Sequence, residues 1–463
     1  MIRLYDTARG EVRDLTLRSP GRVSMYVCGP TVDNLPHLGH GRFSLVWDVA
    51  RRWFTFQGLR VHYVSNITDV DDKIIARANN ESRSEVDVVK QYEHEWWEAM
   101  GRLGVAEPDE VPHATEYIPQ MVELIASFLE RDVAYRTSDG VYFDVSSVPD
   151  YGLLAGQPLD TLRAGARVEG NDEKRSPLDF ALWKNAKPDE PRWPAPFGDG
   201  RPGWHTECVV MSLDLLGEDF DLHCGGLDLK FPHHENERAQ AEAAHKAFAR
   251  HWDHNGSVMV GGEKMSKSLG NFTSLTDLLE STDPRAYRLL VLRSHYRSPL
   301  EVTRDIIADA ERGLARLDAF ARRFDLPALA GERFEVASAH GWEEESLELY
   351  ERVTTLMNDD LNTPAAVGEL FEALSAANAL ADDSLLIPAK RLAQSINVLF
   401  GAMGLALLAG GHVVDEESDR LVRERDRARS AKDWSEADRL RRALSERGWI
   451  VEDAASGTVI RRP

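Results

Sequence analysis

The sequence contains few cysteines, which argues against a secreted fold stabilised by disulfides. Only three occur in 463 residues, Cys28, Cys208 and Cys224, and long stretches separate them. Secreted domains that depend on disulfides carry more cysteines at closer spacing. Each thiol is therefore expected to be free, or to bind a metal, in a reducing compartment.

Long apolar runs are also missing. The longest, LFGAMGLALLAGG from Leu399, is interrupted by glycines and is too short to span a bilayer. The first residues, MIRLYDTARGEV, include no apolar segment of the kind found in signal peptides. These absences predict a cytoplasmic protein without a membrane segment, and the chain length suggests about three domains.

Positive charge is scarce over most of the chain. The 55 Lys and Arg residues stand against 77 Asp and Glu residues, which gives a formal net charge of -22. A general polyanion-binding protein needs the opposite balance. Residues 419–463 differ, because they hold 12 Lys and Arg against 9 Asp and Glu. That tail suits either a local contact with nucleic acid or a solvated helical face of mixed charge.

Two strand-helix units follow each other near the N-terminus. The segment RVSMYVCGP at 22–30 predicts a buried strand and a turn, and HLGHGRFSLVWDVARRWFTFQG from His37 predicts a helix that stops at Gly58. A second strand from Leu59 leads to a second helix, with Thr68 as its expected N-cap. Such units build a parallel sheet covered by helices, with its chemistry at the carboxyl ends of the strands. Cys28 lies at such an end.

The pattern changes between residues 133 and 200. Short apolar runs separated by turns lead into the Pro- and Gly-rich segment AKPDEPRWPAPFGDGRPGW, which predicts an insertion that splits the sheet domain. The alternating pattern resumes with the strand FDLHCGG and the helix HHENERAQAEAAH, and helices dominate from about residue 285.

The later helices are expected to form a bundle. In NTPAAVGELFEALSAANALA, Thr363 suits a helix cap and Pro364 suits the first helical position. An apolar stripe at helical spacing follows, formed by Val367, Leu370, Phe371 and Leu374. The fold class is therefore α/β: a Rossmann-type parallel-sheet domain split by an insertion, then an α-helical bundle and a small C-terminal domain.

A first candidate site for an anion is PHLGHGR at residues 36–42. It follows a strand and opens a helix, so its backbone N–H groups and the positive helix end point toward a bound anion. His37 and His40 lie one turn apart and can donate hydrogen bonds to phosphate oxygens, while Gly39 leaves room for a flat base. Two histidines on a helix are also common as plain polar surface.

A second candidate is the segment GGEKMSKSLGN from Gly261. Lys264 and Lys267 flank two serines there and could neutralise the charge on a departing pyrophosphate. Exposed loops are often rich in Lys and Ser, so this segment alone is weak. Together with H-x-G-H about 220 residues earlier in this sequence, it indicates nucleotide chemistry.

The segment KFPHHENERAQ at residues 230–240 offers metal ligands. Pro232 suits the first turn of a helix, on which His233 and Glu237 share one face. The pair is either half of a metal site or a solvated pair on an amphipathic surface, because zinc usually takes four ligands. The missing ligands would have to come from elsewhere in the chain.

Six segments together resemble one family. H-x-G-H paired with KMSKS resembles the signatures of class I aminoacyl-tRNA synthetases, and the whole chain is similar to the cysteinyl-tRNA synthetases among them. The segments that carry the resemblance are YVCGPTVDNLPHLGHGR, NITDVDDKIIARA, RPGWHTEC, FPHHENE, EKMSKSLGNF and ARSAKDWSEADRLRRALSERGW.

The resemblance implies an enzyme that activates L-cysteine with MgATP and transfers it to tRNA(Cys) as a monomer in the cytoplasm. It implies one Zn²⁺ ion that binds the substrate thiol, held by Cys28, Cys208, His233 and Glu237. A purely structural zinc is the competing interpretation. Cys224 is interpreted as a small buried thiol. Asp69, Asp71 and Asp72 could bind Mg²⁺, but acids in the first turn of a helix ordinarily interact with its dipole.

The resemblance also assigns roles in the active site. ATP would contact His37, Gly39, His40, Lys264 and Lys267, of which the histidines and lysines would be catalytic. The residues expected around the bound cysteine are Gly29, Thr31, Thr68, Trp204, His223 and Asp228. Asp33, Asn34 and Leu227 depart from the family pattern, which leaves the fine substrate contacts open.

The implied domains follow the predicted fold. They are the two catalytic halves at 1–132 and 201–285, a connective insertion at 133–200, a stem-contact segment at 286–310, a tRNA-binding helical bundle at 311–408 and an anticodon-recognition domain at 409–463. Trp434 and Trp449 in the tail could stack on bases, although tryptophans are more often core residues.

Three alternatives differ from this interpretation in particular features. A paralogous ligase that joins cysteine to an amino sugar resembles the same catalytic core but lacks the full tail. A catalytically silent tRNA-binding paralogue would not need both nucleotide signatures. A simple nucleotidyltransferase would explain H-x-G-H but neither the zinc ligands nor the length.

Overall fold

The computed structural model describes residues 1–156, 173–188, 190–261, 263–264, 274–329, 344–409, 416–454 and 457–461. The chain divides into two compact units. Unit 1 comprises Met1–Ser281, Val291–Thr303 and Thr354–Ala366, and unit 2 comprises Thr282–Leu290, Arg304–Val353 and Val367–Pro463. Within the described ranges, none of the helices combines the length and apolar character needed to cross a membrane.

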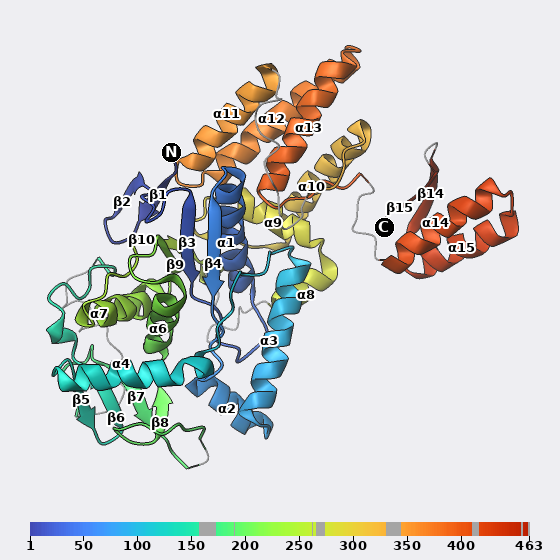
Figure 1. The fold of residues 1–463 in the computed structure, drawn as a ribbon. Coiled ribbons are helices and arrows are strands. Elements are labelled where there is room, and N and C mark those ends of the chain that lie inside the picture. Colours follow the sequence, from blue (N-terminus) through green and yellow to red (C-terminus); the bar gives the residue numbers. More distant parts are fainter. Residues whose placement is uncertain are drawn as a thin grey trace. The chain divides into compact units, whose positions relative to one another are not determined.

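A four-stranded parallel sheet forms the centre of unit 1 (Figure 1). Its strands, in order across the sheet, are β10 (His251–Asn255), β9 (Leu222–Gly226), β3 (Arg22–Val27) and β4 (Arg60–Ser65). All three pairings are parallel, and β9 and β10 come from sequence about 200 residues after β3 in this chain. This arrangement confirms the predicted α/β class. It brings together strand ends that are far apart in the sequence.

The first predicted helix is confirmed as α1 (Leu38–Phe56), with His37 as its N-cap. Gly58 lies just beyond its end with a φ of 84°, a left-handed conformation that glycine adopts without strain. The helix is largely buried, including Trp47, Trp53 and Phe54. The C-terminal part of α1 is therefore packed into the core, and its N-terminal end carries the H-x-G-H motif.

The predicted cap of the second helix is wrong. Helix α2 (Asp72–Glu81) starts three residues later than expected, and the side chain of Asp71 accepts the capping hydrogen bond from the Lys73 backbone N–H at 2.9 Å. The Thr68 hydroxyl donates instead to the buried carboxylate of Glu207, at 2.8 Å. A tertiary partner has replaced the local capping role that the threonine could have had.

The segment predicted as an insertion contains a separate antiparallel sheet. Its strands are β5 (Ala134–Thr137), β6 (Gly140–Phe143), β7 (Phe180–Asn185) and β8 (Gly200–Pro202), adjacent in that order. The short helix η2 (Val145–Ser147) follows β6. Strand β8 leads directly into α6 (Trp204–Leu216), so this sheet fixes the start of a helix that belongs to the site described below.

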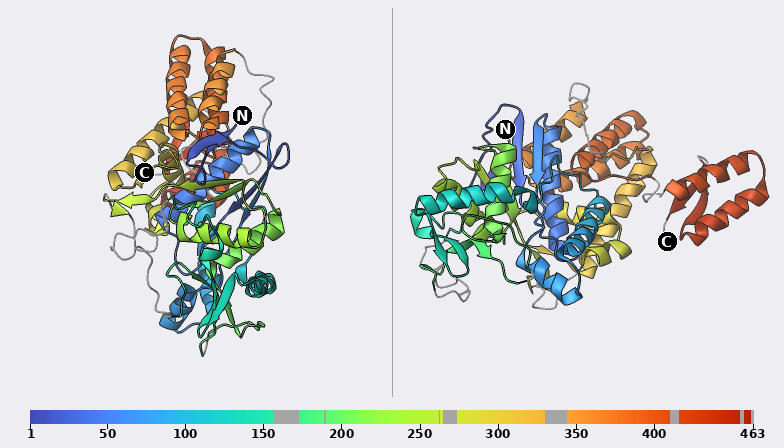
Figure 2. Two further views of the ribbon diagram at one scale, coloured as in Figure 1. Left: turned by 90° about the vertical axis from the view of Figure 1, so that its left-hand side faces the viewer. Right: turned by 60° about the horizontal axis from the view of Figure 1, so that its bottom comes forward.

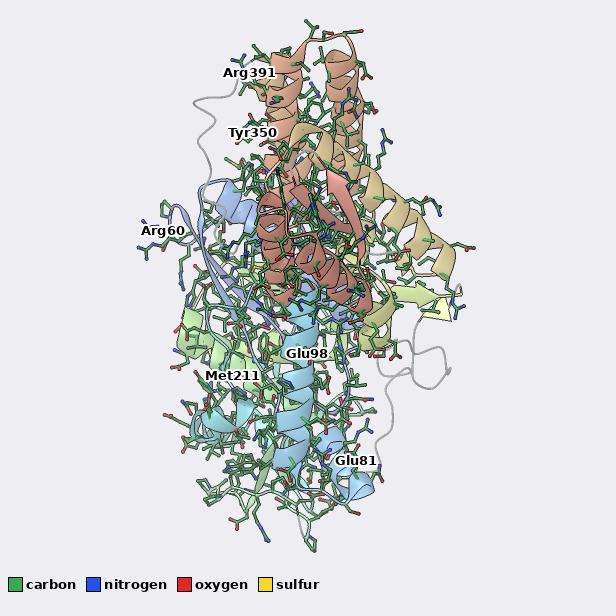
Figure 3. All side chains as sticks on the ribbon, turned by 90° about the vertical axis from the view of Figure 1, so that its right-hand side faces the viewer. Arg60, Glu81, Glu98, Met211, Tyr350 and Arg391 are labelled. Carbon is green, nitrogen blue, oxygen red and sulfur yellow. The ribbon has the colours of Figure 1, made fainter. Side chains whose placement is uncertain are left out.

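Further elements complete unit 1. They are the hairpin of β1 (Arg3–Asp6) and β2 (Glu11–Asp14), α3 (Glu85–Arg102), η1 (Ala114–Tyr117), α4 (Ile118–Glu130), η3 (Lys230–His234), α7 (Glu235–Ala243), α8 (Leu275–Ser281) and a small sheet ordered β12 (Glu263–Lys264), β11 (Val258–Val260), β13 (Leu300–Glu301). Figure 3 labels Glu81 at the end of α2 and Glu98 on α3.

The entry into the HHENE helix differs from the prediction. Pro232 was expected in the first turn, but Phe231 has extended backbone angles (φ -144°, ψ 132°) and the regular helix α7 starts only at Glu235. His233 and Glu237 nevertheless face each other one turn apart, as predicted, with His233 Nε2 3.0 Å from Glu237 Oε1.

Helices dominate the chain after residue 283, as the sequence predicts (Figure 2). They are α9 (Pro284–Leu292), α10 (Arg304–Phe324), α11 (Glu344–Asn358), α12 (Thr363–Asp382), α13 (Leu386–Ala402), α14 (Glu416–Ser430) and α15 (Trp434–Glu446). Val367, Leu370 and Leu374 on α12 are buried, which confirms a core role for the stripe.

The C-terminal part has its own small core. The hairpin of β14 (Ile450–Ala454) and β15 (Gly457–Arg461) packs with α14 and α15 around Leu440, Leu444 and Trp449. The Trp449 indole N–H donates to the Ser418 hydroxyl at 2.9 Å, and its side chain is buried. A stacking role for Trp449 is therefore wrong in this fold, whereas Trp434 is 61% exposed.

Candidate active site

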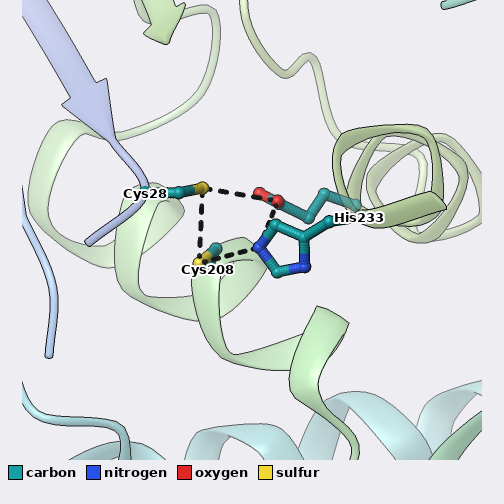
Figure 4. Close-up of side chains that lie close together, drawn as sticks. Cys28, Cys208 and His233 are labelled. Carbon is teal, nitrogen blue, oxygen red and sulfur yellow. Dashed lines mark hydrogen bonds and ion pairs between the residues drawn. The ribbon is translucent and has the colours of Figure 1, made fainter. Parts of the chain in front are cut away.

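Four side chains from distant parts of the sequence meet beside the parallel sheet. Cys28 follows β3, Cys208 lies on α6, His233 precedes α7 and Glu237 lies on its first turn. Figure 4 shows Cys28, Cys208 and His233 pointing toward a common centre. We call Cys28, Cys208, His233 and Glu237 the four-donor cluster. One donor atom from each lies within 4.8 Å of the other three, and all four residues are buried.

The donor atoms are separated by distances suited to a shared ion. The two sulfurs are 3.6 Å apart, Cys28 Sγ is 3.5 Å from Glu237 Oε1, and Cys208 Sγ is 3.6 Å from His233 Nε2. Four such donors around one centre can surround a metal ion. The same geometry without a metal is a network of hydrogen bonds.

The electrostatics of the four-donor cluster favour charged ligands despite burial. Burial opposes ionisation of Glu237, but His223 and His233 outweigh it and hold the pKa of this carboxyl well below its usual range. Burial also opposes ionisation of Cys208, yet hydrogen bonds from Cys28 and His233 lower its pKa to about 6. Burial raises the pKa of Cys28. The protein thus favours the anionic forms of Cys208 and Glu237, whereas burial favours the neutral thiol of Cys28.

A second layer of side chains orients the cluster. His233 Nδ1 lies 2.8 Å from Nδ1 of His205, and His223 Nε2 lies 2.7 Å from Glu237 Oε2. Metal-binding histidines generally donate their second ring N–H to such a partner, which fixes the tautomer. The Trp204 ring stacks on His233 with centroids 4.1 Å apart. These contacts hold the donors in place before any ligand binds.

His223 also belongs to an alternative donor set. Cys28, His223, His234 and Glu237 satisfy the same distance criterion as the four-donor cluster. The two sets share Cys28 and Glu237. His223 was expected near the bound cysteine, and the structure places its ring against the carboxylate of Glu237 instead of along the pocket described next.

A pocket of about 400 Å³ connects the four-donor cluster to the H-x-G-H motif. Cys28, Gly29, Thr31, Trp204 and Asp228 line the part that we call the cluster side, and His37, Gly39, His40 and Val258 line the part that we call the nucleotide side. Most of the predicted substrate contacts therefore share one cavity. Thr68 and His223 are buried and do not line it.

Close packing shapes the cluster side. The Gly29 N–H donates to the Asn66 side chain at 2.9 Å, and a Cβ at residue 29 would lie 1.6 Å from the Asn66 carbonyl oxygen. Only glycine fits this approach. The two chain segments that carry Cys28 and Thr68 are thereby held in contact.

The nucleotide side has two oriented imidazoles. The backbone N–H of His40 donates to His37 Nδ1 at 3.2 Å, that of His37 donates to His40 Nδ1 at 3.4 Å, and the rings stack with centroids 3.6 Å apart. A neutral imidazole whose Nδ1 accepts carries its proton on Nε2. Each ring therefore presents an N–H donor at the positive end of α1, where an anion is favoured.

The second nucleotide motif is described only in part. Lys264 pairs through its backbone with Met259 in the β11–β12 hairpin. Its side chain, Lys267 and the rest of the segment from 265 to 273 lie outside the described residues. Asp69 accepts from Thr115, Asp71 caps α2, and Asp72 pairs with Lys184 and Arg201, so these acids have protein partners.

Two polar residues of the site went unrecognised in the sequence. Lys73 lines the pocket, with its ammonium 5.7 Å from the centroid of the Trp204 ring, and Asn66 bridges Gly29 and Thr68. Both lie in the segment NITDVDDK, which carries the family resemblance. For Asn66, its polarity next to the end of β4 was the available indication.

Comparison with protein families matches three consecutive regions. Residues 15–312 match the class I (C) tRNA synthetase catalytic domain, residues 352–408 match the DALR domain, and residues 412–461 match the cysteinyl-tRNA ligase anticodon binding domain. The first match alone covers more than half of the chain.

Whole-length relatives agree with these matches. The cysteine–tRNA ligases of Chromobacterium violaceum and Methylobacillus flagellatus are each 43% identical to this chain, with 100% of both sequences covered. That of Carboxydothermus hydrogenoformans is 41% identical over 98% of this chain and 99% of the relative.

Solved structures with low sequence identity support the fold. Mycobacterium tuberculosis methionyl-tRNA synthetase in complex with methionyl-adenylate superposes with a TM-score of 0.59 at 16% identity, covering 82% of this chain and 89% of that chain. A leucyl-tRNA synthetase complex from Agrobacterium radiobacter reaches 0.60 at 12% identity, with 85% of each chain covered. Fold, conserved domain order and full-length similarity agree: the chain belongs to the cysteinyl-tRNA synthetase family of class I aminoacyl-tRNA synthetases.

Proposed function

We propose that this chain joins L-cysteine to tRNA(Cys) through a cysteinyl-adenylate formed in the pocket described above. The observation that carries the proposal is a single cavity lined by Cys28 of the four-donor cluster and by His37, Gly39 and His40 of the H-x-G-H motif. A thiol-binding group and a phosphate-binding group within one pocket match the two ends of this intermediate.

The four-donor cluster is proposed to hold one Zn²⁺ ion. With Zn–S near 2.3 Å and Zn–N or Zn–O near 2.0–2.1 Å, neighbouring donors that shared one ion would lie about 3.3–3.8 Å apart. The separations between sulfur and its neighbours here, 3.5–3.6 Å, fall in that range, and the His233–Glu237 separation of 3.0 Å is slightly shorter. Two sulfurs, one imidazole and one carboxylate are a donor set that zinc accepts.

Zinc in this place would explain the selection of cysteine over serine. When bound, zinc supplies a Lewis acid that prefers a thiolate to a neutral hydroxyl. A site built around one specific polar interaction rejects analogues that lack it by on the order of 10⁴ or more. Asp228, on the cluster side of the pocket, is proposed to hold the substrate ammonium group, and Gly29, Thr31 and Trp204 to enclose the side chain.

Adenylate formation then needs positioning and charge stabilisation. The cysteine carboxylate attacks the α-phosphorus of MgATP, a new P–O bond forms, and the bond to the β-phosphate breaks to release pyrophosphate. His37 and His40 would donate N–H groups to the phosphates, and Lys264 and Lys267 would neutralise the departing charge. Thr68 and His223 are proposed to support this site through Glu207 and Glu237.

Transfer to tRNA completes the reaction. The terminal 2′-hydroxyl of tRNA attacks the cysteinyl carbonyl, loses its proton and displaces AMP. The match of residues 412–461 to an anticodon binding domain supports tRNA as the acceptor. The proposed tRNA-binding regions are those predicted from the sequence, at 286–310, 311–408 and 409–463, with the catalytic halves at 1–132 and 201–285 and the insertion at 133–200. A monomer in the cytoplasm remains part of the proposal.

Cysteine-dependent exchange between ATP and pyrophosphate, followed by charging of tRNA, tests this function. Exchange and charging are both expected with cysteine and neither with serine. Exchange without charging would favour the ligase that uses an amino sugar as acceptor. Absence of exchange in metal-loaded protein would favour a silent paralogue.

A further inference from the structure

We infer that Arg42 is a positioning residue that sets the spacing between the H-x-G-H histidines and the strand that carries Lys264. The inference rests on the proposed function, because it assumes that both motifs act on the same nucleotide. Arg42 lies on α1, five residues after His37, and is 1% exposed. Nothing in its position suggests direct contact with a substrate, since it does not line the pocket.

The Arg42 guanidinium binds an unusual number of backbone carbonyls. It donates through Nη1 to Gly256 and Ser257, both at 2.9 Å. Through Nη2 it donates to His295 at 3.3 Å, to Tyr296 at 3.1 Å and to Ser298. A planar guanidinium with donors in a fixed fork can hold several acceptors in one geometry, which a lysine ammonium cannot reproduce.

The five carbonyls belong to two chain segments that lie against each other. Residues 256–257 precede β11, and residues 295–298 precede β13. The Gly256 N–H donates to the Tyr296 carbonyl at 2.8 Å, and a Cβ at residue 256 would lie 2.4 Å from the Ser298 oxygen. The segments are therefore packed too closely for a side chain between them, and Arg42 joins both to α1.

We call these five hydrogen bonds from Arg42 the clamp. The segment that it holds at residues 256–257 leads directly to the second nucleotide motif. Strand β11 continues from Ser257, pairs with β13 in parallel on one edge, and pairs with β12 on the other. Lys264 is the partner of Met259 in the β11–β12 pairing. The route from Arg42 to the Lys264 backbone therefore runs through the side-chain hydrogen bonds to residues 256 and 257, along β11, and across the β11–β12 pairing.

The same clamp shapes the pocket wall. Asn255, Gly256, Ser257 and Val258 line the same cavity as His37, Gly39 and His40 from the start of α1. Displacing a reacting group by about 1 Å can reduce a rate roughly 100-fold. If Arg42 fixes the wall and β11, its loss should slow the chemical step while leaving the four-donor cluster intact.

The test is Arg42→Lys in the full-length, metal-loaded protein. We expect the kcat of cysteine-dependent pyrophosphate exchange to fall about 10- to 100-fold, as for a group displaced by up to 1 Å. Metal content and the KM for cysteine should stay within roughly twofold, since the cluster side does not contact Arg42. A matched control is Arg52→Lys, a buried arginine on the same helix that binds Asp48 and the Gly104 carbonyl. The control should not change the ratio of kcat to the KM for cysteine.

A double-mutant cycle with Lys264→Ala separates positioning from general damage. If Arg42 acts through the Lys264 strand, Arg42→Lys should cost much less in the Lys264→Ala background than in the parent protein, because coupled residues are not additive. Equal losses in both backgrounds would overturn the inference, as would an unchanged kcat in the single variant.

A second variant covers the case in which Arg42→Lys damages the whole active site. If Arg42→Lys loses metal or cysteine binding, Arg42→Met is carried through the same measurements, and loss of the cluster side in both variants would contradict a role confined to the second motif. If the parent protein shows no cysteine-dependent pyrophosphate exchange, the proposed function itself is contradicted.

Discussion

The two sides of the pocket are built differently. The cluster side adjoins the four-donor cluster through Cys28, and the four donors are buried, come from separate elements and are held by further side chains such as His205 and His223. On the nucleotide side, His37 and His40 are only half-buried at a helix end, and Lys264 lies on a short hairpin.

The difference matches the demands of the two ligands. Selection between a thiol and a hydroxyl depends on one short contact, so its donors must be fixed before the substrate arrives. Phosphate groups carry charge on many oxygens, so donors at a helix end and on a loop can stabilise them while the reaction proceeds. A variant on one side should therefore leave the other side largely intact.

The largest effect is expected from Cys208→Ser. Replacing a thiolate donor with a hydroxyl should release the metal and raise the KM for cysteine by on the order of 100-fold or more, since the selective contact is lost. The KM for ATP should change by no more than roughly twofold if the two sides are independent. Metal content and exchange kinetics with each substrate varied in turn measure both. Cys224→Ala is the control, because Cys224 is buried outside both donor sets. Equal loss of cysteine and ATP binding would indicate a structural metal.

The opposite pattern is expected from His40→Asn. Asparagine can still accept the capping hydrogen bond from the His37 backbone, but the donor to phosphate is lost. We expect kcat to fall about 100-fold, as when one donor to a developing charge is removed. Metal content should stay unchanged, which elemental analysis checks. His94→Asn, at an exposed position on α3, serves as the control. A raised KM for cysteine with normal kcat would contradict the division between the two sides.

A smaller effect is expected from His223→Gln, which separates ligand orientation from substrate contact. If His223 acts by holding Glu237, the Kd for zinc should rise about 10- to 100-fold, the usual result of losing such a partner. At saturating zinc the KM for cysteine should then return close to the parent value. A KM that remains high in saturating zinc would show that His223 contacts the substrate. His251→Gln, a buried histidine on β10 outside both donor sets, is the matched control.

The smallest effect concerns a buried acid beneath the nucleotide side. Asp253 lies two residues before Asn255 of the pocket wall, and the Tyr296 hydroxyl lies 3.0 Å from its Oδ2 and 2.7 Å from Asp360 Oδ1. One hydroxyl proton cannot serve two carboxylates, and Asp360 already pairs with Arg297. A protonated Asp253 that donates to the Tyr296 hydroxyl, which in turn donates to Asp360, satisfies all three groups. Burial, with Asp360 adding to it, raises the pKa of Asp253 well above its usual range.

The raised pKa of Asp253 determines how the stability of the fold depends on pH. Above pH ~4 the unfolded chain releases the Asp253 proton while the folded chain keeps it, so this residue's contribution to stability falls as pH rises toward the folded pKa. Asp253→Asn keeps a donor to Tyr296 and removes this loss. We expect the stability of the variant relative to the parent to be higher at pH 8 than at pH 5.5, by up to about 1.4 kcal/mol for each pH unit below the folded pKa of Asp253. Urea unfolding at both pH values measures it. A larger gain at pH 5.5 would contradict a protonated Asp253.

The fold class and one pair of the proposed metal ligands could be predicted from the sequence because each depends on local chemistry. Strand and helix periodicity predicted β3, α1, β4 and β9, and the spacing of His233 and Glu237 predicted their shared face. The family resemblance, and not spacing, selected Cys28 and Cys208 as the other donors. The structure brings all four together, which is the arrangement that the proposed zinc site requires.

The errors arose where a side chain had a choice of partners. Thr68 has the chemistry of an N-cap, but the buried Glu207 carboxylate offers its hydroxyl a stronger partner, and Asp71 caps α2 instead. For Trp449 the sequence allows base stacking or the commoner core position, and packing with Leu440 and Leu444 buries it. Neither choice can be read from neighbouring residues.

The sequence by itself determined the order of strands and helices, the two nucleotide motifs and the residue types that can bind zinc, since these depend on periodicity and on side-chain chemistry. Tertiary structure alone decided which distant groups meet: His223 on Glu237, Arg42 on two separate loops, and Tyr296 between two acids. The physical reason is that burial makes every unpaired polar group costly, so the final partners are selected by the packing of the whole unit and not by the chain on either side.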